Sequence, residues 1–164
     1  MPITITIDDR EVMDALRRLQ ARLGDLTPVM RVVAQMMESA VQRNFADGGR
    51  PDKWKPSKRA QRQNGQTLID TGRLKNSITS RSDAASAEVG TNVEYAAIHQ
   101  FGGKTKASVI RPKNKQALFW PGAKHPVKMV KHPGSVIPAR PFLVIPDEDM
   151  GYIKDTLGKF LESG

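Results

Sequence analysis

The first fifty residues show two different hydrophobic periodicities. Residues 3–7 read Ile-Thr-Ile-Thr-Ile, an alternation of β-branched side chains that predicts a short strand with one buried face. Helical spacing follows, and Asp8 or Asp9 can cap a helix that ends near Gly24. The apolar face of this helix comprises Val12, Leu16, Leu19 and Leu23.

A second helix is predicted from Thr27 to the glycine pair at positions 48–49. Thr27 is expected to be its N-cap and Pro28 its first residue, a position where the missing amide proton costs nothing. The apolar stripe comprises Val29, Val33, Met36, Ala40 and Phe45. Because each helix has one apolar face to cover, we expect both to pack on a sheet formed by later strands.

The middle of the chain predicts short elements. Residues 50–66 are polar apart from Trp54, which indicates a loop with a short helix after Ser57. Another short helix is expected within residues 68–78. The segment 77–91 has the pattern of a hairpin, with strand-like runs on either side of a polar turn.

From residue 95 onward the signals become shorter still. Residues 95–101 predict one or two helical turns that end at Gly102-Gly103. Seven of the 11 prolines lie between Arg111 and Pro146, which argues against a long helix there. Short β-like runs remain at residues 108–111, 117–120 and 127–131. We interpret residues 104–132 as a basic β-arm or long hairpin that projects from the body of the domain.

A last helix is predicted after Pro146. Three acidic residues at positions 147–149 occupy its first turn, where the helix dipole favours negative charge. Its buried face comprises Ile153, Leu157, Phe160 and Leu161. The expected fold class is α+β. N-terminal helices and a C-terminal helix pack on a small antiparallel sheet within one domain, residues 1–164.

Charge is concentrated in the middle of the chain. The 164 residues carry a formal charge of +9 and contain no cysteine. The net charge is −1 over residues 1–49, +12 over residues 50–132 and −2 over residues 133–164. No carboxylate occurs in the 52 residues between Glu94 and Asp147, which contain nine Lys or Arg and all three His. Apolar runs are far shorter than the ~20 residues of a bilayer span, so no membrane partner is expected.

Residues that could perform catalysis are scattered. The motifs of phosphate loops, dinucleotide sites and α/β-hydrolases are missing. His99, His125 and His132 have no neighbouring carboxylate to orient them on a metal. The aspartates available to a metal-dependent nuclease lack D-x-D spacing: they are Asp47, Asp52, Asp70 and Asp83. Asp70 with Thr71 is better interpreted as a helix cap and Asp83 as a turn residue. We predict no catalytic residue, metal site or cofactor.

The basic segment predicts attraction to an anionic partner. Binders of single-stranded nucleic acid interleave aromatic rings with charges, but here only Phe101, Phe119 and Trp120 lie among the cations. Contact with a nucleic-acid backbone and a cationic protein interface therefore both stay open. Trp54 is expected to pack in a groove of its own chain. Tyr95 and Phe101 are expected to bracket the core contacts of a short helix.

Five groups of residues follow one another along most of the chain. In order they are Gly49-Arg50-Pro51 with Trp54, Thr71-Gly72-Arg73-Leu74, Val89-Gly90-Thr91-Asn92, YAAIHQFGG at 95–103 and IPARPFL at 137–143. This order resembles the phage virion morphogenesis (tail completion) family of Mu-like phages and prophages. The YAAIHQFGG and PARPF elements are, more distantly, similar to neck proteins of long-tailed phages. The resemblance covers about residues 3–161.

The resemblance implies an α+β subunit of a ring at the head–tail junction, without enzymatic activity. Such a protein would be located in the virion, after a period in the host cytoplasm during assembly. The matched positions would have structural or interface roles: Trp54, Gly72, Leu74, Gly90, Tyr95, His99, Phe101, Gly102, Pro138, Arg140, Pro141 and Phe142. Gly72, Gly90 and Gly102 are expected at turns with positive φ or at close approaches. Arg140, between two prolines, suits pairing with a carboxylate of the same or a neighbouring subunit.

A ring around a DNA channel would repeat the basic segment about its axis. We predict a collar formed by Lys104, Lys106, Arg111, Lys113 and Lys115. It would face the DNA backbone in the lumen or an acidic neighbouring ring. The expected partners are further copies of the chain, with a hexamer favoured, and the adjacent head-side connector and tail proteins. Two alternatives are a tail terminator ring that caps the tail tube and a monomeric, non-specific DNA-binding module. An enzyme would need a metal or nucleotide for which the sequence offers no place.

Overall fold

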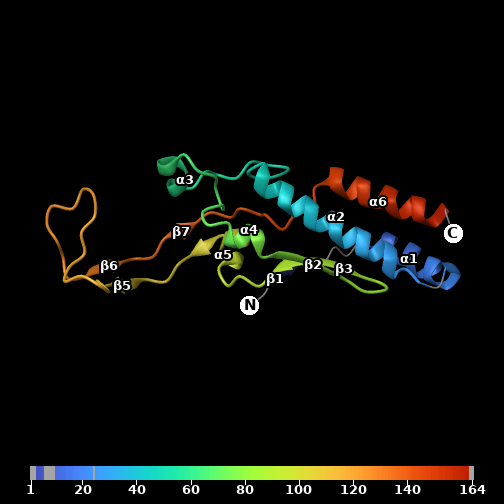
Figure 1. The fold of residues 1–164 in the computed structure, drawn as a ribbon, viewed down its shortest axis with the longest axis horizontal. Coiled ribbons are helices and arrows are strands. Elements are labelled where there is room, and N and C mark those ends of the chain that lie inside the picture. The colour runs from blue at the N-terminus through green and yellow to red at the C-terminus, as the bar shows by residue number, and fades with distance from the viewer. Residues whose placement is uncertain (1–2, 6–9, 24, 163–164) are drawn as a thin grey trace.

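The computed structural model describes residues 3–5, 10–23 and 25–162, and it shows a body of helices and a small sheet from which a long arm extends (Figure 1). The helices are α1 (Arg10–Leu23), α2 (Thr27–Ala46), α3 (Lys58–Gln63), α4 (Arg73–Asn76), α5 (Ala96–Phe101) and α6 (Asp147–Glu162). The strands are β1 (Ile3–Ile5), β2 (Ile78–Ser82), β3 (Ala87–Thr91), β4 (Gly103–Lys104), β5 (Ser108–Ile110), β6 (Val130–His132) and β7 (Val136–Ile137). No helix among these residues has the length and apolar character of a membrane span.

The long helix α2 is the centre of the body. It packs against β2 and β3 on one side and against α6 on another (Figure 1). Its buried positions extend beyond the predicted stripe: Val29, Met30, Val33, Ala34, Met37, Ala40, Val41, Asn44 and Phe45. The wider buried face follows from its two packing partners, because a helix between two layers needs more than one apolar stripe. The α+β fold class predicted from the sequence is confirmed.

The start of α2 differs from the prediction by one residue. Leu26 is the N-cap residue, so Thr27 lies inside the helix. The Asp25 carboxylate accepts a hydrogen bond from the Thr27 amide at 2.9 Å. Hydrogen bonding to the Thr27 side chain, and then to this amide, lowers the pKa of Asp25. The end agrees better, since the last helical residue precedes Asp47 and Gly48, which has φ of +69°.

The body sheet has three antiparallel strands in the order β1-β3-β2. The predicted N-terminal strand is present at residues 3–5, whereas residues 6–9 and Gly24 lie outside the described part of the chain. The predicted hairpin forms β2 and β3. Its turn is closed by Asp83, whose carboxylate accepts hydrogen bonds from the amides of Ala85 and Ser86, both at 2.7 Å. Gly90, which is expected from the sequence at a turn or a close approach, lies within the central strand β3, where it pairs with Thr4 and Thr79.

The predicted helix after Ser57 is α3, and the Ser57 hydroxyl caps it by accepting a hydrogen bond from the Ala60 amide at 3.1 Å. The helix predicted after Asp70-Thr71 is α4, but its N-cap is Gly72, with φ of +79°. Asp70 instead forms an ion pair with Arg59 at 3.4 Å. A residue without a Cβ adopts that left-handed backbone at little cost. The Thr71 hydroxyl accepts a hydrogen bond from the Arg73 amide at 3.4 Å, so one residue of the predicted pair does bond to the first turn of α4.

The arm is a narrow antiparallel ribbon. At its root β4 pairs with β7, and further out β5 pairs with β6. The strand expected at residues 117–120 is reduced to a bridge between Leu118 and Val127 near the tip. The strand expected at 127–131 lies at Val130–His132. Prolines at 112, 121, 126 and 133 lack the amide proton that a ladder requires, so pairing along the arm is interrupted.

Helix α6 returns the chain to the body and lies beside α2 (Figure 1). Ile153 and Leu157 are buried as predicted, and Phe160 is partly buried against the core. The side chain of Leu161 lies outside the described part of the structure. The aromatic centre of the core is Phe45, whose ring centroid lies 5.7 Å from that of Trp54 and 5.3 Å from that of Phe142.

Candidate functional site: the basic arm and its anchor

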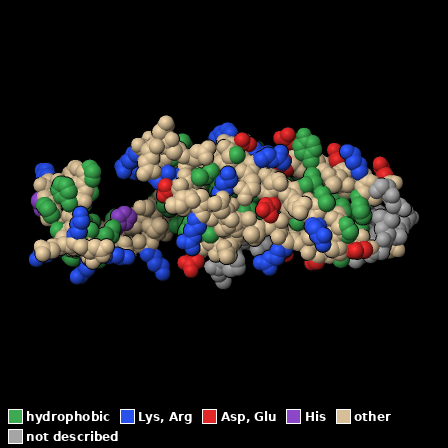
Figure 2. Space-filling view, in the orientation of Figure 1, with side chains coloured by type: hydrophobic (Ala, Val, Ile, Leu, Met, Phe, Trp, Pro, Cys, Tyr) green, Lys and Arg blue, Asp and Glu red, His purple; other side chains and the backbone are tan. Residues whose placement is uncertain are grey.

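The surface of the arm is covered with cations. Figure 2 shows Lys and Arg side chains along its whole length on the visible face, with no acidic side chain among them. All five residues of the predicted collar are exposed: Lys104, Lys106, Arg111, Lys113 and Lys115. Within the described residues, none of the arm's Lys or Arg side chains has an ion-pair partner. The arm therefore presents positive charge that the chain itself does not neutralise.

The arm and its root also expose most of the large hydrophobic side chains on the described surface. Seven of the ten lie between residues 101 and 136: Phe101, Val109, Ile110, Phe119, Trp120, Met129 and Val136. Phe119 is 67% exposed and Val136 is 77% exposed. A two-stranded ribbon is only marginally stable in water by itself, and exposed apolar side chains in such number mark contact surfaces. The arm has the surface of an element that is completed by a partner.

The root of the arm is fixed to the body by hydrogen bonds to the backbone of residues 140–143. The buried Gln100 side chain accepts from the amides of Phe142 at 2.9 Å and Leu143 at 3.0 Å. The Trp54 indole donates to the carbonyl of Pro141 at 3.0 Å, so its expected packing within the chain is observed. The helix α5, the loop around Trp54 and the PARPF segment thus form one anchor, which positions the arm relative to the body.

Gly102 is the tightest point of this anchor. It has φ of +72°, and a Cβ there would lie 2.8 Å from the Ala139 nitrogen and 3.1 Å from the Ile137 carbonyl oxygen. We expect Gly102→Ala to lower the free energy of unfolding by at least about 2 kcal/mol, because neither backbone atom can move freely. Gly48→Ala is the matched control. Gly48 also has a positive φ, of +69°, but a Cβ added there would have no atom within 4 Å. Gly48→Ala therefore tests backbone strain alone, and we expect it to lower the free energy of unfolding by about 1 kcal/mol. Equal losses of unfolding free energy in the two variants, measured by urea unfolding, would show that the close approach at Gly102 adds no cost.

Arg140 does not pair with any carboxylate of the described residues, which differs from one of the two pairings expected from the sequence. Its Nε donates to the Lys55 carbonyl at 2.9 Å, and its amide donates to the His99 carbonyl at 2.7 Å. The residue is 5% exposed and forms no ion pair within the described part of the chain. Burial lowers the pKa of its guanidinium, because the charged form is poorly solvated there.

His99 lies between Arg140 and Tyr95. Its ring meets the Tyr95 ring edge-on at a centroid distance of 5.9 Å, and its Nδ1 is buried without a hydrogen-bond partner. Burial lowers the pKa of His99 below its usual value of 6.5, and the charge of Arg140 lowers it further. The imidazole is therefore neutral in the folded protein at neutral pH.

This pKa shift predicts a pH-dependent stability. As pH falls below about 6.5, the unfolded chain protonates His99 before the folded chain does, so the free energy of unfolding decreases. We expect urea unfolding to show lower stability at about pH 5.5 than at about pH 7.5, and His99→Gln to reduce this difference. The hydrogen-bonded carboxylates of Asp25 and Asp83 have pKa values lowered from 3.8. Their protonation therefore affects the free energy of unfolding only at a more acidic pH than that of His99. If His99→Gln loses as much stability between these two pH values as the unmodified protein does, His99 is not the group responsible.

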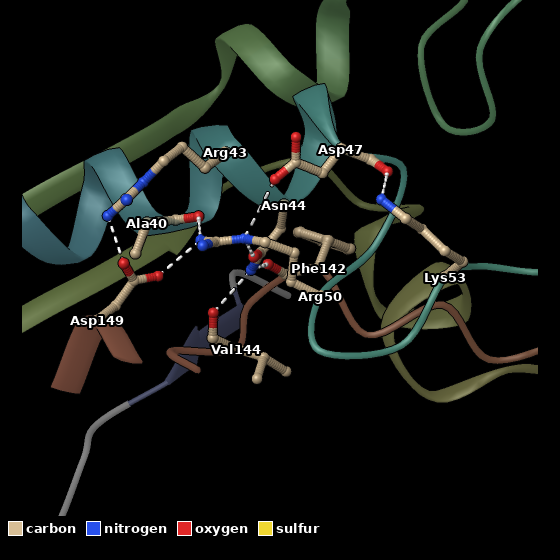
Figure 3. Close-up of polar contacts among 9 residues, drawn as sticks. All are labelled: Ala40, Arg43, Asn44, Asp47, Arg50, Lys53, Phe142, Val144 and Asp149. Atoms are coloured by element: carbon tan, nitrogen blue, oxygen red, sulfur yellow. Dashed lines mark hydrogen bonds and ion pairs between the residues drawn. The ribbon is translucent and has the colours of Figure 1, made fainter. Parts of the chain in front are cut away.

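A second polar cluster fixes α6 to α2 and to the PARPF segment, and the sequence did not predict it. Asp149 is 3% exposed and lies between two arginines, with an ion pair to Arg43 and another to Arg50 at 2.6 Å (Figure 3). Asn44 accepts from Arg50 Nε at 3.0 Å and donates to the Phe142 carbonyl at 2.9 Å. The acidic first turn of α6 was interpreted only as a favourable charge at a helix start. The signal that could have found it is the arginine of the Gly49-Arg50-Pro51 motif.

The other predicted residues divide between core and surface. Leu74 and Phe142 are buried, and Pro138 is half-buried beside the arm root. Tyr95 and Phe101, which are expected from the sequence to bracket the core contacts of α5, are 41% and 68% exposed. Helix α5 buries its small Ala96 and its polar Gln100 instead, since that face must approach the backbone of the anchor. No group of His, Asp or Glu among the described residues is arranged to hold a metal ion.

The fold and this surface define a protein whose distinctive features suit contact with other macromolecules. Comparison with known proteins specifies the class. The model of the phage virion morphogenesis family matches residues 7–162, and the chain belongs to this family. It is also 39% identical over 153 residues to "Mu-like prophage FluMu G protein 2" of Haemophilus influenzae, covering 93% of this chain and 91% of that protein. No solved structure matches the chain. A role in phage morphogenesis follows from this membership.

Proposed function

We propose that this protein is a structural subunit of the head–tail junction, a neck or tail-completion protein that forms a ring between the DNA-filled head and the tail. The observation that supports the proposal is the arm, an anchored ribbon that exposes both unpaired cations and large apolar side chains. Burying such side chains between subunits is favourable by about 25 cal/mol per Å² of apolar surface. The arm is thus suited to contact a neighbouring subunit.

A ring also gives the charge of the arm a purpose. Closed symmetry places one arm per subunit around a common axis, so the positive charge of a single chain is multiplied into a collar. DNA passing through the ring would meet this collar as a series of backbone contacts without sequence preference. The family comparison supports a structural role, and we propose that the protein has no enzymatic activity.

The experiment that tests this function is a null mutation of the gene in its phage or prophage. Loss of a junction protein should leave filled heads and tails of normal length that do not join. Adding the purified protein to the lysate should restore joining. Tails of abnormal length would instead identify a tail terminator. Joined, infectious particles in the null lysate would contradict both assignments, and native mass of the restored assembly would give its number of subunits.

The collar is tested by replacing Lys104, Lys106, Arg111, Lys113 and Lys115 with glutamine. All five are exposed and without ion pairs in the described structure, so thermal unfolding should be unchanged. Joining of heads to tails should be lost. If the collar contacts DNA, removing five cations should also reduce the slope of log K against log salt by roughly 4 to 5 units. A fully infectious variant would contradict a role for the collar.

A further inference from the structure

The hollow that Arg140 lines carries more positive charge than the described residues neutralise. It has a volume of about 320 Å³, and its polar lining includes Arg59, Asp70, Arg73, Tyr95, His99 and Arg140. Arg59 is already paired with Asp70 and hydrogen-bonded to the carbonyls of Gln66 and Ile69. Arg73 is exposed and has no ion pair within the described residues. Two guanidinium groups therefore face the same hollow without a counter-ion.

Arg140 is the less usual of the two. Only its Nε is hydrogen-bonded, to the Lys55 carbonyl, which leaves both terminal nitrogens without a partner in the described structure. A buried cation without an anionic partner is costly, and arginines so buried are normally paired. The anchor nevertheless holds Arg140 in place. Its backbone amide donates a hydrogen bond to the His99 carbonyl, and the neighbouring Pro141 carbonyl accepts one from the Trp54 indole. A rigid, unpaired guanidinium is prepared for a ligand.

We propose that this hollow binds a carboxylate side chain presented by another protein chain of the assembled particle, held between Arg140 and Arg73. The two oxygens of a carboxylate match the planar fork of a guanidinium, which gives a bidentate, charge-assisted pair. His99 lines the same hollow, and its buried Nδ1 has no hydrogen-bond partner among the described residues. The second chain is supplied by the proposed assembly role, on which the inference rests.

A protein carboxylate fits this hollow better than DNA does. A duplex carries its phosphates on a broad and rigid surface, whereas Arg140 is recessed and only 5% exposed. Leu68, Leu74 and Tyr95 also line the hollow, and they provide apolar contact for the stem of an aspartate or glutamate. The exposed cations of the arm are the better contacts for a nucleic-acid backbone. The two kinds of positive surface thus select different partners.

The test is a calorimetric titration of the whole chain with an end-blocked tetraglutamate peptide. Tetraglutamate should bind and tetraglutamine should not. Arg140→Gln should weaken binding at least about tenfold, because it removes a charge-assisted bidentate pair. Arg73→Gln should weaken it roughly two- to fivefold, as expected for an exposed charge. Arg81→Gln is the matched control, since Arg81 is an exposed arginine of β2 outside the hollow. Thermal unfolding checks the fold of each variant, and the exposed Arg73 keeps the test valid if Arg140→Gln is unstable.

Binding of tetraglutamate that depends on neither Arg140 nor Arg73 would overturn the proposal. So would inorganic phosphate or a short DNA duplex that competes for the hollow with the same dependence on Arg140. Once peptide binding is established, loss of self-association in Arg140→Gln assigns the carboxylate to a second copy, and unchanged self-association assigns it to a different protein. The null-mutant experiment fails or succeeds separately, because the peptide titration uses the isolated chain.

Discussion

Asp149→Asn is expected to destabilise the protein more than any other single polar substitution in the described body. Asp149 has a side chain that is 2% exposed, and it neutralises Arg50, whose side chain is 15% exposed. Replacing the carboxylate with an amide leaves the Arg50 guanidinium with only its longer ion pair to the more exposed Asp47, at 3.6 Å. Breaking a largely buried pair by removing one partner typically costs about 3–5 kcal/mol. Arg50 also bonds to Asn44 and to the carbonyl of Ala40, so the disturbance reaches the anchor of the arm (Figure 3).

Urea unfolding of the purified variants measures this effect. Asp147→Asn is the matched control, because Asp147 lies in the same first turn of α6 but is exposed. Its loss should be within about 0.5 kcal/mol, as for most surface substitutions. The loss of unfolding free energy in Arg43→Met should lie between those of the two aspartate variants. The Arg43 side chain is 49% exposed, so solvent screens its ion pair with Asp149. Equal stabilities of Asp149→Asn and Asp147→Asn would show that the cluster does not hold α6 in place.

Removal of the arm should separate assembly from folding. Residues 106–134 can be replaced by Asn-Gly, because Thr105 and Ser135 are already hydrogen-bonded across the ribbon at 2.9 Å and 2.7 Å. Asn-Gly favours the tight turn that joins two antiparallel strands. Residues of the main core cluster all lie outside the deleted segment, so the thermal unfolding of the body should change little. The shortened chain should fail to assemble and should not restore joining of heads to tails.

The comparison to make is between the shortened chain and the full chain in the same null lysate. Thermal unfolding and circular dichroism establish that the body is folded. If the shortened chain restores infectious particles as well as the full chain does, the arm has no role in assembly, and the proposed function loses its main support. A shortened chain that cannot fold would contradict the separation of arm and body described above.

The parts of the fold that could be predicted from the sequence are those with local signals. The 3–4 spacing of apolar residues predicted α2 and α6, and alternation predicted β1, because these patterns reflect burial on one face. Strand-like runs on either side of a polar turn predicted the β2–β3 hairpin. The concentration of prolines predicted an irregular β-arm. Boundaries were less accurate: the N-cap of α2 is Leu26 rather than Thr27, and the N-cap of α4 is Gly72, whose left-handed backbone favours glycine.

The parts that could not be predicted depend on residues far apart in the chain. Nothing local to Asp149 indicates that Arg50, 99 positions earlier, will be its partner. Tyr95 and Phe101 are expected from the sequence to bracket the core contacts of α5. The helix instead buries Gln100, whose side chain makes three hydrogen bonds to the backbone of Phe142 and Leu143. Arg140 was expected to have a carboxylate partner. Its lack of one within the described chain could be recognised only in three dimensions.

The central claim is that this protein forms a ring at the head–tail junction and that its arms contact neighbouring subunits. Electron cryomicroscopy of the native particle tests this most directly, because one reconstruction shows the position of the protein, its copy number and the surroundings of the arm. We predict a closed ring between the head and the tail, with the arm of each subunit, including Phe119 and Trp120, against an adjacent chain. A density located elsewhere in the particle, or a ring whose arms touch no other chain, would contradict the account.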